Sequence, residues 1–192
     1  MPEKKILYFD EIVDGNTEKT LAAAKKRADE LGIKEIIVSS TRGGTALKAL
    51  DLFGEGYKVI VVTHSAGFRE PGKIEMADET KEEIVAKGGI VLTTIHAFAG
   101  VDRAINKKFN TIGPSELVAN VLRMFGQGMK VCVETVYMAA DAGLLSMGSD
   151  VVSIAGTGKG CDTAVVVKPA HLNDMFDLYV KEIICKPTVK KH

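Results

Sequence analysis

Residues 36–47 of the chain read Ile36-Ile37-Val38-Ser39-Ser40-Thr41-Arg42-Gly43-Gly44-Thr45-Ala46-Leu47. The stretch begins as an apolar, β-branched run, which is typical of a strand that is buried on both faces. It ends in residues that favour a helix, and hydroxyl residues, one arginine and two glycines lie between the two parts. A strand that turns directly into a helix predicts a βα unit of a parallel sheet.

The turn at 40–45 has the composition of an anion-binding turn. Its two glycines let backbone N–H groups point inward, and the new helix presents unpaired N–H groups and the positive end of its dipole. Ser40, Thr41 and Thr45 can add hydroxyl donors, while Arg42 can add a planar charged fork. A plain Ser or Thr helix cap is the alternative. Because open α/β sheets bind ligands at the carboxyl ends of their strands, we favour a phosphate or another anion.

Composition limits the class of protein. The chain has 192 residues, enough for one domain, and 46% of them are apolar. Its 25 basic residues balance 25 acidic ones, which argues against a nucleic-acid partner. No apolar run is long enough to cross a membrane, and residues 1–5 lack the apolar segment of a signal peptide. The cysteines at 132, 161 and 185 are odd in number, which fits a reducing cytoplasm.

Apolar runs alternate with amphipathic stretches along the whole chain. We expect strands at 6–9, 36–40, 58–63, 90–94, 150–155, 163–167 and 178–185, and helices at 17–31, 45–53, 77–86, 113–124 and 129–142. The loop between 150–155 and 163–167 is too short for a helical crossover, so these two strands should be antiparallel. The rhythm predicts one domain over 1–192, a three-layer α/β/α fold with a mostly parallel sheet, a closing antiparallel strand and a long helical insertion at 95–149.

Four polar clusters follow expected strands and should meet at one rim of the sheet. They are the turn at 40–45, Thr63 to Phe68, Thr93 to Phe98, and the glycine-rich loop Gly156 to Thr163. Shared placement at strand ends favours one pocket. The candidate binding residues are Ser40, Thr41, Arg42, Gly43, Gly44, Thr45, Thr63, His64, Gly67, Phe68, His96, Phe98, Gly156, Thr157, Gly158, Lys159, Cys161 and Asp162.

The glycine-rich loop matches neither common nucleotide-binding template, because a strand and not a helix follows it. It is either a flap that carries Lys159 and Asp162 or a plain hairpin. Phe68 and Phe98 either stack on a planar ring or pack the loops onto the sheet. His64 and His96 have no acidic partner at ligand spacing, so no metal is expected. Nucleophilic catalysis by Cys161 is disfavoured, and no catalytic residue is assigned.

Residues 36–46 resemble the corresponding segment of the pyruvate kinase C-terminal domain, in which a Thr-x-Ser-Gly-x-Ser/Thr-Ala turn grips a phosphate. Ser40, Gly43, Thr45 and Ala46 fill matching places, whereas Arg42 replaces a hydroxyl residue and Gly44 follows the glycine. Residues 59–63 resemble the next strand of that domain, and residues 150–169 resemble its closing strand pair with the glycine-rich loop between. The chain has no room for a catalytic barrel, so phosphoryl transfer from phosphoenolpyruvate is not expected.

The additional segments are similar to those of stand-alone prokaryotic, largely archaeal, relatives of this domain. These relatives are known to bind flavin mononucleotide (FMN) at the equivalent rim. The resemblance therefore implies FMN, with its 5′-phosphate on the turn at 40–45 and its ribityl chain and ring toward 63–68, 96–98 and 156–163. A flavin-dependent oxidoreductase and an effector-binding regulatory subunit are the alternatives. A homo-oligomer could form through the methionine-rich helices at 116–145.

Overall fold

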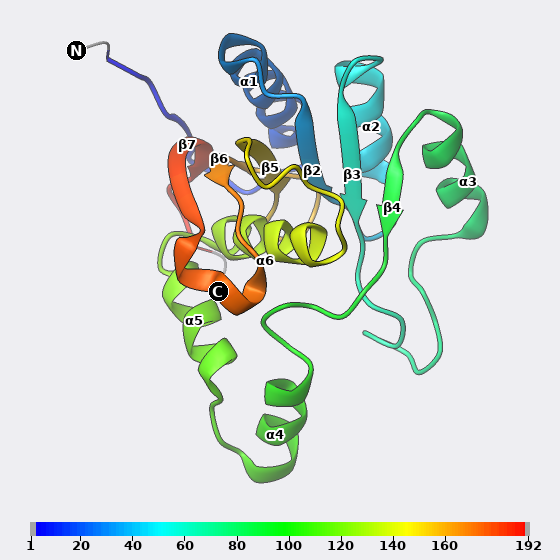
Figure 1. The fold of residues 1–192 in the computed structure, drawn as a ribbon, viewed down its shortest axis with the longest axis vertical. Coiled ribbons are helices and arrows are strands. Elements are labelled where there is room, and N and C mark those ends of the chain that lie inside the picture. Colours follow the sequence, from blue (N-terminus) through cyan, green and yellow to red (C-terminus); the bar gives the residue numbers. More distant parts are fainter. Residues whose placement is uncertain (1–2, 191–192) are drawn as a thin grey trace.

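The computed structural model of the chain describes residues 3–190, which form one seven-stranded sheet with helices on both faces (Figure 1). The elements in chain order are β1 (Leu7–Phe9), α1 (Asn16–Leu31), β2 (Glu35–Ser39), α2 (Gly44–Phe53), β3 (Lys58–Val62), α3 (Asp78–Ala86), β4 (Ile90–Leu92), α4 (Val101–Phe109), α5 (Pro114–Arg123), α6 (Gln127–Asp141), β5 (Val151–Ala155), β6 (Thr163–Lys168), η1 (Leu172–Asp177) and β7 (Tyr179–Pro187). Residues 1–2 and 191–192 of the single domain expected over 1–192 lie outside the described residues.

The strands lie in the order β1-β7-β6-β5-β2-β3-β4. Strands β5, β2, β3 and β4 are parallel to one another, whereas β6 is antiparallel to both β5 and β7. The first strand, β1, pairs in parallel with the last, β7, and forms one edge of the sheet. The expected mostly parallel sheet with an antiparallel β5–β6 pair is confirmed.

The sheet is buried on both faces, which explains the apolar run in β2. Ile36 and Val38 pack in the core beneath α1, α2 and α3, whereas Ile37 packs in the core beneath α5 and α6. All three side chains are fully buried. Because successive residues of a strand point to opposite faces, only a strand covered on both sides is apolar at every position. The three-layer α/β/α architecture is therefore confirmed.

Parallel pairing brings the ends of the central strands to one edge. The Ser40 N–H donates to the Val62 carbonyl at 3.0 Å, and the Thr63 N–H donates to the Leu92 carbonyl at 3.0 Å. The Thr63 and Thr93 hydroxyls lie 2.8 Å apart. The polar residues that follow β2, β3 and β4 thus begin side by side.

Three elements differ from the expectation. Helix α4 was not predicted: none of its residues is buried, and it lies between Gly100 and the left-handed Asn110 (φ 51°). The short η1 was not predicted either, and β7 extends two residues beyond the expected Cys185 because β1 pairs with its end.

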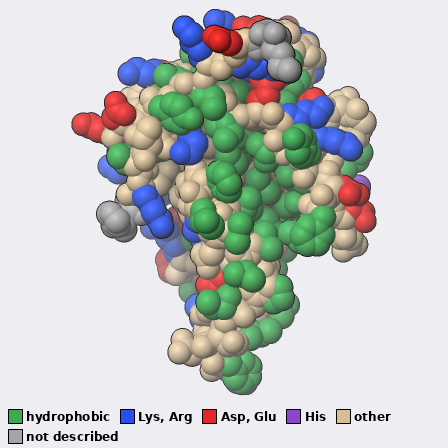
Figure 2. Space-filling view, turned by 90° about the vertical axis from the view of Figure 1, so that its left-hand side faces the viewer, with side chains coloured by type: hydrophobic (Ala, Val, Ile, Leu, Met, Phe, Trp, Pro, Cys, Tyr) green, Lys and Arg blue, Asp and Glu red, His purple; other side chains and the backbone are tan. Residues whose placement is uncertain are grey.

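Helices α4 and α5 form an arm that projects from the sheet (Figure 1). Exposed apolar side chains recur every three to four residues along each helix, and Figure 2 shows apolar side chains continuing onto the lower end of the molecule. The exposed residues are Val101, Ile105, Phe109, Ile112, Leu117, Val121, Met124 and Phe125. No helix within residues 3–190 combines the length and the apolar character needed to span a bilayer.

Met129 and Met138 are buried in the core, so only part of the helices at 116–145 is available for self-association. The exposed apolar residues of the arm form one surface on α4 and α5, and a standard protein interface takes about 800 Å² from each partner. We expect a second copy of the chain to cover this surface. Size-exclusion chromatography with light scattering should give twice the 20.6 kDa chain mass, and Leu117→Glu with Met124→Glu should give monomer.

The matched control is Val85→Glu, which adds a charge at an exposed apolar position of α3, away from the arm. It should leave the mass unchanged. A wild-type protein that elutes as a monomer at every concentration, or a control that dissociates as readily as the arm variant, would contradict self-association through the arm.

Candidate functional site

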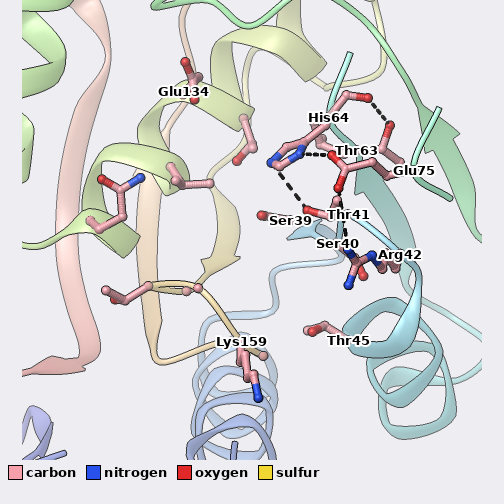
Figure 3. A pocket seen from close by; sticks show the side chains of 18 of the residues that line it. Ser39, Ser40, Thr41, Arg42, Thr45, Thr63, His64, Glu75, Glu134 and Lys159 are labelled. Atoms are coloured by element: carbon pink, nitrogen blue, oxygen red, sulfur yellow. Dashed lines mark hydrogen bonds and ion pairs between the residues drawn. The ribbon is translucent and has the colours of Figure 1, made fainter. Parts of the chain in front are cut away.

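A pocket of about 770 Å³ lies at the carboxyl edge of the central strands (Figure 3). The turn between β2 and α2 forms one wall, and one side of α6 forms the wall opposite. The loops after β3, β4 and β5 complete it, and Arg103 of α4 and Arg123 of α5 also line it. Pockets of this size hold ligands such as nucleotides and drug-sized molecules.

The turn at 40–45 leaves two helix amides available to a ligand. Gly43, at φ 94°, precedes the first residue of α2, and the Ser40 Oγ accepts the Ala46 N–H at 3.3 Å. Among residues 3–190, no acceptor pairs with the Gly44 and Thr45 amides, which belong to the first turn of the helix. The N-cap of α2 is Gly43, with no side-chain cap hydrogen bond, so the alternative of a plain Ser or Thr cap is wrong. The Ser40 hydroxyl accepts the Ala46 N–H and can still donate its own proton.

A network of charged and polar side chains fixes the entrance to the turn. His64 Nε2 lies 3.4 Å from the Thr41 hydroxyl, and His64 Nδ1 lies 2.6 Å from Glu75 Oε2. The other oxygen of this carboxylate, Glu75 Oε1, lies 3.0 Å from Arg69 Nε and 4.0 Å from a terminal nitrogen of Arg42. Glu75 thus hydrogen-bonds His64 and forms an ion pair with Arg69, while the Arg42 side chain, 4.0 Å away, remains 72% exposed.

Three rings that line the pocket lie close together. The Phe68 ring centroid is 4.0 Å from that of His64 and 5.1 Å from that of His96, and the Phe68 and His96 rings are stacked. His96 Nε2 is buried and has no hydrogen-bond partner among the described residues. The cluster offers flat apolar surface together with a nitrogen atom that can pair with a ligand.

A buried ion pair lies on the α6 wall. Lys130 and Glu134 are 7% and 3% exposed, and the Lys130 ammonium donates to the Glu134 carboxylate. The Phe98 N–H donates to the other carboxylate oxygen at 3.1 Å. Burial lowers the pKa of Lys130, and Glu134 opposes that shift. Burial likewise lowers the pKa of His96, which is therefore a neutral imidazole at neutral pH.

The pocket is positively charged although the chain is neutral. Seven lysines and arginines line it, against three acidic residues, Asp14, Glu75 and Glu134. Most of these cations are partly exposed, so the field is available to a ligand. A basic pocket in a protein with no net charge favours an anionic small molecule.

Comparison with known proteins places this fold in a family. The sequence model of the "Pyruvate kinase, alpha/beta domain" matches residues 18–167, which is more than half of the chain. The chain belongs to the pyruvate kinase alpha/beta domain family. The matched residues include the turn at 40–45 and the loop at 156–162. Most of the residues that line the pocket of this chain therefore lie in its matched part.

Solved structures similar to the chain include pyruvate kinases of Cryptosporidium parvum. One is 17% identical over 81% of this chain and 22% of its own, with a TM-score of 0.42. A second is 15% identical over 84% of this chain and 24% of its own, with a TM-score of 0.43. The chain therefore spans about a quarter of the length of these enzymes or less.

Most of the binding residues predicted from the sequence do line the pocket. The predicted residues that line it are Ser40, Thr41, Arg42, Gly44, Thr45, Thr63, His64, Phe68, His96, Gly156, Thr157, Gly158 and Lys159. They come from four loops that are far apart in the sequence. Figure 3 shows the turn on one wall, Glu134 on the opposite wall and Lys159 on the loop between.

Five predicted residues, Gly43, Gly67, Phe98, Cys161 and Asp162, do not line the pocket. Asp162 is buried and accepts the Thr157 N–H at 3.0 Å and the Thr163 hydroxyl at 2.7 Å, so it holds the loop instead of closing over a ligand. Cys161 is buried beneath the same loop, and burial raises the pKa of its thiol to about 12.

The other three support the pocket walls. Phe98 packs edge-on against Tyr137, with ring centroids 5.8 Å apart, so it does not present a face to a ligand. The Gly67 N–H closes its own loop on the Lys73 carbonyl at 2.8 Å. A Cβ on Gly43 would lie 2.2 Å from a methyl carbon of Thr80, so glycine allows the turn to pack against α3.

Sequence reasoning missed the whole α6 wall and several charged residues. The pairing of Lys130 with Glu134 could have been predicted, because they are the only charged residues in the mostly apolar run 128–140. They are four residues apart, which puts them on the same face of a helix. Glu75, Arg103 and Arg123 lie in irregular or helical segments with no motif around them. The missed residues that line the pocket are Asp14, Thr17, Ser39, Lys48, Val62, Arg69, Glu75, Arg103, Arg123, Gln127, Lys130, Val131, Glu134, Thr135, Met138 and Gly160.

The fold brings His64 and His96 together, with ring centroids 5.4 Å apart. Both nitrogens of His64 already face protein partners, Thr41 and Glu75. Within residues 3–190, no group of three or more His, Cys, Asp or Glu side chains is arranged to hold a metal ion.

Breaking the buried ion pair should destabilise the protein. Glu134→Gln keeps an acceptor for the Phe98 N–H but leaves the Lys130 charge buried without its counterion, a loss of about 3–5 kcal/mol in the free energy of unfolding. Lys130→Met combined with Glu134→Gln should recover most of that loss. Urea unfolding of the three proteins measures it, and a double variant no more stable than Glu134→Gln would contradict the assignment.

The lowered pKa of His96 predicts a loss of stability in acid. In the unfolded chain His96 binds a proton near its ordinary pKa of 6.5, whereas in the folded chain it binds one only at lower pH. The free energy of unfolding should therefore fall as the pH drops through that window, by at most about 1.4 kcal/mol per pH unit. Urea unfolding between about pH 7.5 and pH 5.5 gives the free energy of unfolding at each pH, and in His96→Gln this free energy should fall less steeply as the pH drops. If the free energy of unfolding depends on pH equally in the wild type and in His96→Gln, His96 does not contribute to the loss of stability in acid.

Proposed function

We propose that this chain binds a phosphorylated small molecule, FMN being the best candidate, in the pocket at the carboxyl edge of the sheet. One observation carries the proposal: the two available amides of the α2 first turn lie beside Arg42 in a pocket where cations outnumber acids seven to three. Backbone amides, a helix dipole and a guanidinium at one point are the groups that bind phosphate in proteins.

The residues present fit the separate parts of FMN. Gly44, Thr45 and the Ser40, Thr41 and Thr45 hydroxyls would hold the phosphate, with Arg42 moving onto it. The Thr63 hydroxyl and the loop at 156–160 supply polar partners for a ribityl chain. The Phe68 ring and the buried His96 nitrogen supply a flat surface and a hydrogen-bonding atom for a planar ring.

FMN is favoured over a simple sugar phosphate for two reasons. The pocket has a volume of about 770 Å³, and an aromatic cluster lies toward the middle of it. The similarity of the chain to stand-alone FMN-binding relatives supports the same ligand. When bound, FMN would supply redox chemistry, whereas the residues of this chain would bind and orient it.

Arg42→Ala should weaken FMN binding at least tenfold. The variant removes a charge-assisted hydrogen bond to the phosphate worth about 1.5–3 kcal/mol, and about 1.4 kcal/mol corresponds to a factor of ten. Titration of protein into FMN, followed by quenching of flavin fluorescence, gives both dissociation constants. Riboflavin lacks the phosphate, so its affinity should be the same for the wild type and for Arg42→Ala.

The matched control is Lys107→Ala, which removes an exposed cation of α4 that does not line the pocket. Mass spectrometry of the small molecule that the purified protein releases on denaturation identifies the bound ligand independently. A wild-type protein that binds neither FMN nor any other phosphorylated compound would refute the proposal. Loss of riboflavin affinity equal to the loss of FMN affinity in Arg42→Ala would refute the role of the turn.

A further inference from the structure

Three cations from three different helices line the pocket on the side away from the turn. They are Arg103 of α4, Arg123 of α5 and Lys130 of α6. Lys130 pairs with Glu134, but among residues 3–190 neither arginine has an ion-pair partner. Arg123 donates to the neutral side chains of Gln127 and Asn120 at 2.9 and 2.8 Å, and the Arg103 guanidinium lies 4.9 Å from the Phe68 ring centroid.

This arrangement leaves positive charge without compensation. Glu134 pairs with Lys130 and with neither arginine, and both arginines lie close enough to Lys130 to contribute to lowering its pKa. Like charges held together in a partly buried space cost folding free energy. Such groups are characteristic of functional sites, where a ligand provides the missing opposite charge.

The cluster is separate from the turn at 40–45. Its residues belong to α4, α5 and α6, whereas the turn belongs to the β2–α2 connection on the opposite wall (Figure 3). The His64, Phe68 and His96 rings lie between them: His64 contacts Thr41 of the turn, and Arg103 covers Phe68. A phosphate on the turn therefore leaves Arg103 and Arg123 without an acidic partner among the described residues, and Lys130 with Glu134 alone.

We propose that Arg103, Arg123 and Lys130 form a second anion subsite that takes a phosphate or carboxylate group across the ring cluster from the turn. The guanidinium forks of the two arginines suit the paired oxygens of either group, and the Lys130 ammonium adds a compact charge. This proposal rests on the proposed function, in that the turn holds the first anion. The second anionic group belongs either to the same ligand or to a second molecule bound beside it.

Titration with inorganic phosphate, followed in ¹H–¹⁵N NMR spectra at constant ionic strength, tests the subsite. Shifts of the Arg42 Nε–Hε signal and of the Gly44 and Thr45 amide signals should report phosphate binding at the turn. The Nε–Hε signals of Arg103 and Arg123 and the amides of residues 126–130 should report the second subsite, with a separate dissociation constant. In Arg103→Gln with Arg123→Gln, the amides of residues 126–130 should report phosphate binding at least tenfold weaker, while the signals of the turn respond as in the wild type.

Lys107→Gln is the matched control, because it removes one cation from the exposed side of α4 and leaves the pocket lining intact. The dispersion of the same spectra shows whether each variant is folded. The subsite is refuted if only the signals of the turn move, or if residues 126–130 titrate equally in the double variant and in the control. If only the second set moves, the turn fails as the phosphate site and the second subsite stands.

Repeating the titration in saturating FMN distinguishes the two sources of the anion. If FMN itself shifts the second set and abolishes its response to phosphate, one ligand spans both subsites. If the second set still responds to phosphate, the anion comes from a separate molecule. Both results support a second anion subsite, because each requires an anion at Arg103 and Arg123.

Discussion

Parallel alignment of β5, β2, β3 and β4 is the constraint on which the pocket depends. Parallel neighbours cannot be joined by a tight turn, so helices must connect them, and those helices cover both faces of the sheet. Strands β5, β2 and β3 are then buried on both sides, and a slip of one residue would exchange the two buried faces of a strand. The carboxyl ends of the strands and the amino ends of the following helices consequently meet at one edge, where backbone amides and polar loops converge.

The charges at that edge work against stability and suit an anionic ligand. Lys130 is buried and needs Glu134, His96 is held neutral by burial, and Arg103 and Arg123 have no acidic partner among the described residues. A chain with no net charge could have distributed its cations over its surface, where water solvates them. Their concentration at one concave edge is the physical basis for both proposed anion subsites.

Local patterns were sufficient to predict the elements that the sheet itself contains. The run at 36–39 and the run at 59–62 are apolar at nearly every position, and only burial on two faces makes such runs favourable, so strand type and parallel pairing followed. The antiparallel β5–β6 pair followed from the length of its loop. Helix α4 could not be predicted this way, because it buries no residue and its amphipathic pattern faces the surface.

The sequence by itself determined the α/β class, the strand–turn–helix unit at 36–47 and the four loops that reach the pocket, because these depend on periodicity and on glycine and hydroxyl residues close together in the chain. Only the tertiary structure decided which side chains of those loops face inward. It buried Phe98, Cys161 and Asp162 as supports, and it brought Glu75, Lys130 and Arg103 into the pocket from segments without a motif. The physical reason is that orientation and charge pairing depend on packing between helices and loops that are distant in the sequence, which no local pattern records.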